Sequence, residues 1–279
     1  MLAIIGGLGA AVAWTATTLV ASRGSRLIDP WSLLATVMTV GFVIAVPAAF
    51  ASGTPHVNGT SATWLAISGL GNVIGLLFNY SALRIGKVGM VAPITSTEGA
   101  IAATIAVLAG ESLSAGTAVT LAVVAGGVVL AARAQGGESR HHDLRAALFA
   151  CGSALSFGAS IYATGKVGQD LGVAWAALPP RVVGVAVIAL PLAATRRWRM
   201  TRAALPYAVA CGILEFVGFA TYAFGARHGL AVAAVLASQF AGLSVVAGYF
   251  LWRERLARIQ IAGIVAIAVG VSVLSVLHS

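Results

Sequence analysis

Three ionisable side chains lie inside long apolar stretches of the sequence, where a charge is costly. Glu98 lies at the centre of the apolar segment 88–109, Glu215 at the centre of 204–225, and Arg181 early in 173–194. An ionisable residue at the centre of a bilayer costs about 2.5–3.5 kcal/mol on insertion scales, so it indicates either a functional site or a structural pair. Either carboxyl could bind a cation or carry a proton. Alternatively, Arg181 holds one of them in a structural ion pair.

Polar and aromatic side chains at helical spacing extend this candidate site. Thr95 precedes Glu98 by three residues, so the two share a helical face, and Asn72 and Asn79 share a face of the segment 64–84. Buried amides bind either a neighbouring helix or a substrate. Trp14 and other aromatic residues could border a cavity, although packing or anchoring at the membrane interface also explains them. The candidate substrate-binding or coupling residues are Glu98, Glu215, Arg181, Asn72, Asn79, Thr95, Ser96, Tyr222, Ser238, Gln239, Trp14 and Tyr162.

The patterns of enzymes and cofactor sites are missing from the sequence. It has no Ser/His/Asp spacing, no paired cysteines of the CxxC kind and no phosphate-binding glycine loop. His141-His142-Asp143 lies in a polar loop, where adjacent histidines rarely hold a metal, and Cys151 and Cys211 lie in apolar segments, so no disulfide framework is implied. We therefore expect no enzymatic activity, no cofactor and no metal.

The composition is that of a membrane protein. Hydrophobic residues make up 59% of the 279 residues, charged residues only 9%, and the mean hydropathy is +0.96. Soluble domains carry about 25% charged residues. The net charge of +9 comes from Lys and Arg in short loops, which set membrane orientation, so a nucleic-acid partner is not expected.

The apolar runs predict an all-α protein with ten transmembrane helices. The predicted segments are 2–21, 31–51, 64–84, 88–109, 115–133, 146–165, 173–194, 204–225, 230–251 and 257–277. The first reads as a membrane helix rather than a cleaved signal peptide, because no basic region precedes it. A polar linker at 134–145 divides the chain into halves at 1–133 and 146–279.

The two halves are similar when the sequence is shifted by 143 residues. Arg84-x-Gly86 then aligns with Arg227-x-Gly229, and Gly127 with Gly270. Five crossings per half is an odd number, so the second half must enter the membrane from the opposite side, as in an inverted repeat. In this alignment Asn72 is the counterpart of Glu215, Ser96 of Gln239, and Ala241 of Glu98.

Loop charges support the inversion and predict the orientation. Fourteen of the 17 Lys and Arg residues fall on one face, two on the other, and Arg181 lies within a segment. The positive-inside rule then places the basic face in the cytoplasm and both termini outside. The fourteen are Arg23, Arg26, Arg84, Lys87, Arg133, Arg140, Arg145, Arg196, Arg197, Arg199, Arg202, Arg253, Arg255 and Arg258.

Short motifs at equivalent places in both halves resemble a known family. The first copy reads Ala82-Leu83-Arg84, then Ala92-Pro93, then Gly110-Glu111; the second reads Ala226-Arg227, then Arg253-Glu254. The chain resembles the drug/metabolite transporter superfamily, specifically its EamA type, and Arg181 resembles an arginine common near the start of the second helix of that repeat. The second copy departs from the pattern, with Leu236 in place of Pro93.

The resemblance implies two inverted five-helix repeats around a central cavity lined by the third, fourth, eighth and ninth helices. It also implies a secondary transporter of metabolites, amino acids or drugs that works by alternating access, often outward. Protons are candidate coupling ions, since no nucleotide-binding motif is present. We expect a multi-pass protein of the plasma membrane, in contact with lipid and a small-molecule substrate, as a monomer or homodimer. The alternatives are an intramembrane enzyme or lipid-group transferase, and a structural or sensory membrane protein.

Overall fold

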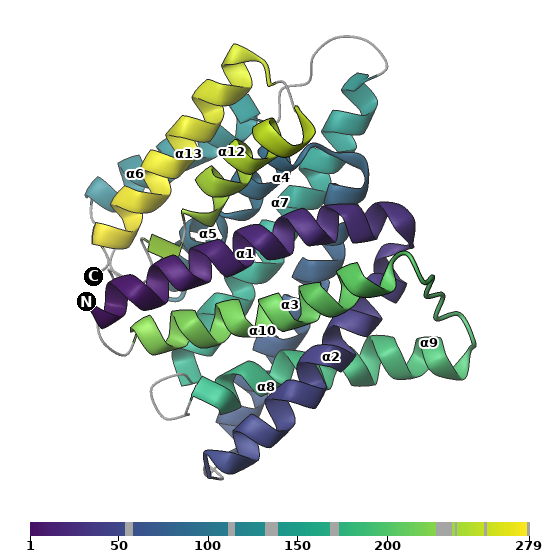
Figure 1. The fold of residues 1–279 in the computed structure, drawn as a ribbon. Helices are drawn as coiled ribbons and strands as arrows, with labels where there is room; N and C mark the ends of the chain where they lie inside the picture. Colours follow the sequence, from purple (N-terminus) through teal and green to yellow (C-terminus); the bar gives the residue numbers. More distant parts are fainter. Residues whose placement is uncertain are drawn as a thin grey trace.

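A computed structural model describes residues 1–53, 58–110, 115–131, 139–167, 173–226, 236–237, 239–253 and 256–277, and the elements in these ranges are helical (Figure 1). The helices are α1 (Leu2–Leu27), α2 (Pro30–Ala51), α3 (Gly59–Ile85), α4 (Val88–Thr95), α5 (Glu98–Leu108), α6 (Ala115–Ala131), α7 (Ser139–Val167), α8 (Val173–Gly184), η1 (Val185–Ala189), α9 (Leu190–Ala194), α10 (Leu205–Ala226), α12 (Phe240–Trp252) and α13 (Arg258–Leu277). The all-helical class with ten predicted spans is confirmed.

Local signals explain several helix boundaries. Asp29 caps α2 by accepting a hydrogen bond from the Ser32 amide at 2.9 Å, and Pro30 is the first helical residue, as its missing N–H favours. Asn58 caps α3 in the same way, so this helix begins five residues before the predicted segment. α7 begins at Ser139, so the second part of the stretch predicted as a polar linker is helical.

Two spans are not continuous α-helices. In the fourth span a turn at Ser96 and Thr97 separates α4 from α5, where the apolar pattern predicts one helix. In the seventh, the π-helical segment η1 joins α8 to α9 just before Pro191, which lacks a backbone N–H and cannot continue regular hydrogen bonding. Irregular backbone at membrane depth is tolerated where protein or water satisfies its polar groups.

The halves contact each other reciprocally. An ideal Cβ placed on Gly75 of α3 would lie 2.5 Å from the Phe157 ring of α7, and one on Gly218 of α10 would lie 2.6 Å from the Trp14 ring of α1. A shift of 143 residues turns the first pair into the second. The same contact thus occurs twice, with the roles of the two halves exchanged, as a two-fold relation between the halves requires. The 143-residue offset found in the sequence therefore also relates positions in the structure.

Substitution of Gly75 tests this packing. We expect Gly75→Ala to lower the free energy of unfolding by about 1–3 kcal/mol, since the added methyl must displace the Phe157 ring. Gly126→Ala in α6 is the matched control, because an ideal Cβ there meets nothing within 4 Å. The measurement is the thermal midpoint of both variants in the same detergent. Equal midpoints would contradict the proposed close contact.

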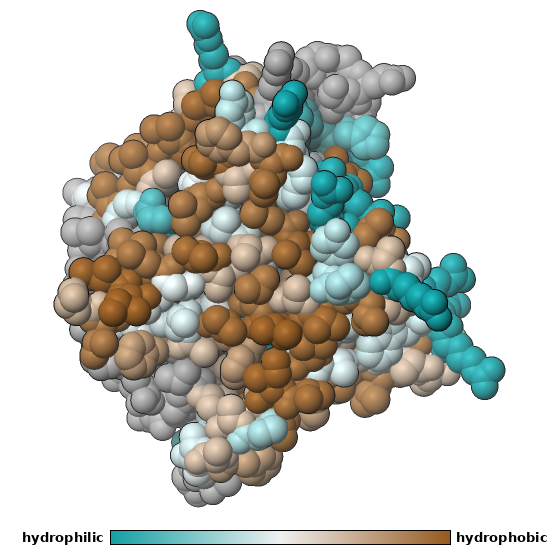
Figure 2. Space-filling view, in the orientation of Figure 1, coloured by the Kyte–Doolittle hydropathy of each residue, from teal (hydrophilic) through white to brown (hydrophobic). Residues whose placement is uncertain are grey.

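The surface and the helix lengths fit a bilayer. Among the described residues six helices are long and apolar enough to cross a membrane. Figure 2 shows hydrophobic residues over the middle of the molecule, while hydrophilic ones gather along the upper and right-hand margin, including the connection between α9 and α10. The start of α1 lies on the opposite, left-hand side in Figure 1.

Candidate functional site

Glu98 is the first residue of α5, directly after the turn that interrupts the fourth span. Two hydroxyl groups hold this turn by donating to carbonyl oxygens of α4: Ser96 to Pro93 at 2.8 Å and Thr97 to Ile94 at 2.7 Å. The half-helix α5 therefore begins at mid-span with a carboxyl group on its first residue. The N-terminus of a helix carries a partial positive charge and unpaired N–H groups, which suit an acidic side chain.

The second acid comes from the other half of the chain. Glu215 lies on α10, and its carboxyl interacts electrostatically with that of Glu98. Two like charges repel strongly in an interior of low dielectric, so the pair is stable only when a proton or a cation neutralises part of its charge. The predicted candidates Glu98 and Glu215 are thus brought together.

Arg181 supplies the cation beside this pair. Its side chain is 1% exposed, and its guanidinium carbon lies 5.9 Å from the centre of the Phe219 ring. It interacts electrostatically with Glu215, yet neither of its terminal nitrogens has a hydrogen-bond partner among the described residues. Gly41 of α2 makes room for the arginine stem, since an ideal Cβ there would lie 3.1 Å from the Arg181 Cγ. A buried guanidinium with free N–H groups is poorly compensated.

Tyr80 and Cys211 are two members of this cluster that sequence reasoning missed. The Tyr80 hydroxyl lies 3.4 Å from the Cys211 sulfur, and both side chains are fully buried. Tyr80 also interacts electrostatically with Glu215 and Arg181. Cys211 precedes Glu215 by four residues, so its place on the same face of α10 could have been read from the spacing. Nothing in the pattern around Tyr80 distinguishes it from a core aromatic residue.

Several candidate residues carry unpaired buried oxygens. The side-chain oxygens of Asn72, Asn79 and Thr95 are buried without a hydrogen-bond partner in the described part of the chain, and so is that of Ser244 in α12. A buried polar atom without a partner costs about 1–3 kcal/mol, so such atoms are rarely left unsatisfied. They are acceptors that a ligand or water could use.

A cluster of aromatic residues includes Tyr222, which lies near Glu98. The Trp14 ring lies 5.8 Å from that of Tyr222 and 6.1 Å from that of Phe240, and Tyr222 also interacts electrostatically with Glu98. The other predicted aromatic residue, Tyr162, packs on Trp64, with their ring centres 6.0 Å apart.

The remaining candidates lie in the fourth and ninth predicted spans. The Ser96 hydroxyl donates to a carbonyl of α4. The Gln239 amide lies just before α12 and donates to the Ser272 hydroxyl at 3.1 Å. Ser238 lies outside the described residues.

Comparison with known protein families explains the duplicated architecture. The model of the EamA-like transporter family matches residues 1–133 and again residues 144–276. The chain belongs to the EamA-like transporter family. Two matches in tandem confirm the duplicated halves, and membership makes the chain a multi-pass membrane transporter, from a family that is typically not enzymatic.

Other comparisons bear on the fold alone. Among curated proteins, none has significant sequence similarity to this EamA-like chain. A solved structure titled "Crystal structure of protein" superposes with a TM-score of 0.65 and 19% identity, over 99% of this chain and 96% of its own. That similarity confirms the arrangement of the helices and carries no information about substrate.

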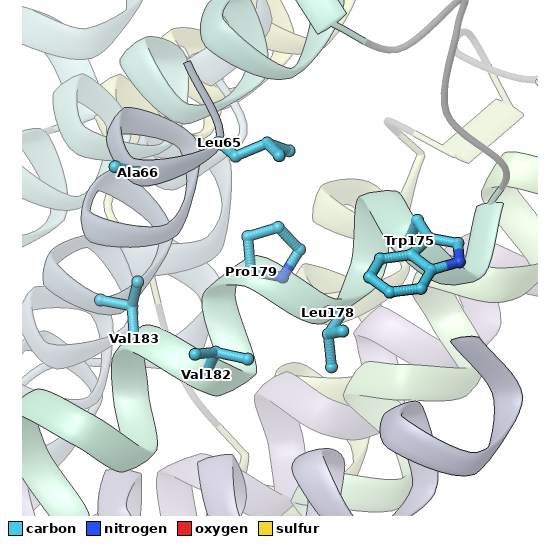
Figure 3. A pocket seen from close by; sticks show the side chains of 7 residues that line it. All are labelled: Leu65, Ala66, Trp175, Leu178, Pro179, Val182 and Val183. Carbon is cyan, nitrogen blue, oxygen red and sulfur yellow. The ribbon is translucent and has the colours of Figure 1, made fainter. Parts of the chain in front are cut away.

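This EamA-like transporter also has a groove of about 240 Å³ that is lined by other residues than the candidates. Its lining is Leu65, Ala66, Trp175, Leu178, Pro179, Val182 and Val183, from α3 and α8 (Figure 3). None of these is a candidate residue, and among the described residues no charged side chain lines the groove. Ligand sites normally combine an apolar lining with a few polar groups that fix orientation. We therefore centre the candidate site on the acids.

Proposed function

We propose that this EamA-like transporter is a proton-coupled secondary exporter of small molecules that carry a cationic group. The observation that supports this most strongly is that Glu98 and Glu215, one acid from each half, lie close enough inside the membrane to repel each other electrostatically. Arg181 compensates one of the two carboxylates, so one negative charge remains, and a proton and a substrate ammonium can replace each other on it. The expected cargo is a metabolite, amino acid or drug of this kind.

Alternating access turns this exchange into export. In the proposed cycle the substrate cation binds the acids from the cytoplasm and displaces a proton. After the halves rock, a proton from outside replaces the substrate, and the protonated pair returns. Repeats related by inversion support such a motion, since exchanging the conformations of the two halves opens the opposite face.

Neighbouring groups suit the rest of such a substrate. Tyr222 lies close enough to Glu98 to interact with it electrostatically, and the Trp14 ring packs on Tyr222, so the two rings offer an apolar surface with affinity for cations. The unpaired oxygens of Asn72 and Asn79 offer hydrogen-bond acceptors. The positions equivalent to these amides in the second half are Glu215 and Tyr222, so the two faces differ in chemistry although their helices are related.

A substrate screen in proteoliposomes tests the proposal. Primary amines, amino acids and lipophilic cations are supplied on the basic face, with and without an imposed pH gradient. We expect a subset of the cations to be transported faster when the pH is lower on the opposite face. Transport of the cations at the same rate with and without the gradient would contradict proton coupling.

We further propose that the basic face is cytoplasmic and that the protein lies in the plasma membrane with both termini outside. The split of fourteen basic residues against two supports this. A C-terminal reporter that is active only in the cytoplasm should therefore be silent, whereas the same reporter fused after Arg202 should be active. Strong activity at the C-terminus would overturn the orientation and leave the duplicated fold untouched.

A further inference from the structure

Two arginines near the end of α1 bind neighbouring helices at the basic face. Arg26 donates from its Nη2 to the Gly86 carbonyl at 2.9 Å and from its Nε to the Leu83 carbonyl at 3.4 Å. These carbonyls lie at the end of α3, where helix geometry leaves them unpaired. Arg23 lies over the ring of Trp252, the last residue of α12, at 5.9 Å. Arg26 thus fixes α1 against α3 within the first half, and Arg23 joins α1 to the second half.

A second set of contacts at the same face joins α2 to the connection between α9 and α10. The Trp198 ring N–H donates to the Thr36 hydroxyl at 3.1 Å. The Arg199 amide donates to the Ser32 hydroxyl at 3.0 Å. Both bonds cross between the halves, so they must break if the halves separate here.

The fourth span is more deeply buried toward the basic face than toward the opposite face. All eight residues of α4, which lies toward the basic face, are buried. In α5, toward the opposite face, Thr104 is exposed and Leu108 is 83% exposed. Among the described residues, this span is therefore buried more completely on its basic side than on the opposite side.

The repeat cannot form the same contacts on the opposite face. A shift of 143 residues replaces Trp252 by Ala109, Thr36 by Pro179 and Trp198 by Pro55, none of which has the ring or hydrogen-bonding group needed. One different contact is found there, in which the Trp175 ring N–H donates to the Gly53 carbonyl and joins α8 to the end of α2. If the two halves were identical, the conformations closed at either face would be equally stable. These differences between the halves therefore favour closure at the basic face.

We infer that the contact of Arg23 with Trp252 and the two bonds from α2 to the connection before α10 form a gate, which Arg26 supports by fixing α1 against α3, and that the protein rests with its basic face closed. This inference rests on the alternating access in the proposed function. Substrate arriving at the basic face must break the gate, and the gate reforms after release on the other side. The two arginines thus set the population of the two conformations, although they lie outside the substrate site.

Cys211 is a natural reporter for the state of this gate. It is fully buried and lies one helical turn closer than Glu215 to the basic-face end of α10. In a Cys151→Ser background it is the one remaining thiol. A membrane-impermeant maleimide applied to the basic face of membrane vesicles should then label Cys211 slowly while the gate is closed.

Opening the gate should raise the labelling rate. We expect Arg23→Gln and Arg26→Gln each to increase it about tenfold, the shift expected from losing one charge-assisted contact. Arg26→Lys, which keeps the charge without the paired donors, should give a smaller increase at unchanged thermal midpoint. Arg197→Gln, an exposed arginine on the same face, is the control and should leave the rate unchanged.

Rapid labelling of the parent protein, or equal rates in the parent and both gate variants, would overturn the inference. An equal increase in Arg197→Gln would also overturn it, because net charge would then explain the effect. Labelling needs neither substrate nor a pH gradient, so a failure of proton coupling leaves this test intact.

Discussion

Replacing Glu98 with Gln is expected to leave substrate binding in place and to remove the dependence of transport on the pH gradient. Gln has nearly the same shape but cannot carry a proton, so the pair with Glu215 loses its exchangeable charge. Gradient-driven transport should fall about tenfold or more, since a hydrogen bond to a charged group contributes about 1.5–3 kcal/mol. The measurement is transport in proteoliposomes with and without the gradient, alongside equilibrium binding.

The control is Glu138→Gln, the same chemical change in the polar stretch between the halves. It should retain both transport and its response to the gradient. If Glu98→Gln folds normally and keeps the parent's pH dependence, then Glu98 does not carry the coupling proton. The symmetry-related position is Ala241, so no second carboxyl is available there to take over the role.

Neutralising Glu215 is expected to act on stability as well as on transport. Arg181 is 1% exposed, and its terminal nitrogens have no hydrogen-bond partner in the part of the chain that the structure describes, so Glu215 is its main electrostatic compensation there. Leaving a buried charge without a partner costs about 3–5 kcal/mol. Glu215→Gln should therefore lower the thermal midpoint in detergent clearly, and Glu98→Gln should lower it less.

A second substitution should restore that stability. Met38 occupies the position equivalent to Arg181 in the first half, and Gly184 accommodates it as Gly41 accommodates the arginine. Arg181→Met in the Glu215→Gln background removes the uncompensated charge, so the double variant should regain most of the lost midpoint without regaining transport. If the two substitutions lower the midpoint additively, then Arg181 and Glu215 are not coupled.

The spans were predictable because twenty apolar residues in a row have few alternatives to a membrane helix. The interruption before Glu98 was not predicted, because Pro93 and the run of Thr95, Ser96 and Thr97 lie within a stretch whose hydropathy suggests one helix. The hydroxyl groups compete with the helix for its own carbonyls, which is a local effect that hydropathy does not measure.

The site was only partly predictable for a different reason. A charge in an apolar run is visible in sequence, and this identified Glu98, Glu215 and Arg181 without any alignment. Which charges meet depends on how the spans pack, and that is decided by contacts such as Gly41 with Arg181. Tyr80 shows the limit most clearly, since its proximity to Glu215 follows from tertiary packing alone.

Proton release on substrate binding tests the central claim most directly. Purified protein in weak buffer is titrated with the cation that is transported best, and the change in pH is followed with an indicator dye. We predict that the parent protein releases protons as the cation binds, and that the Glu98→Gln, Glu215→Gln double variant releases none. Binding by the parent without proton release, or undiminished release from the double variant, would contradict an exchange of proton and substrate on these two acids.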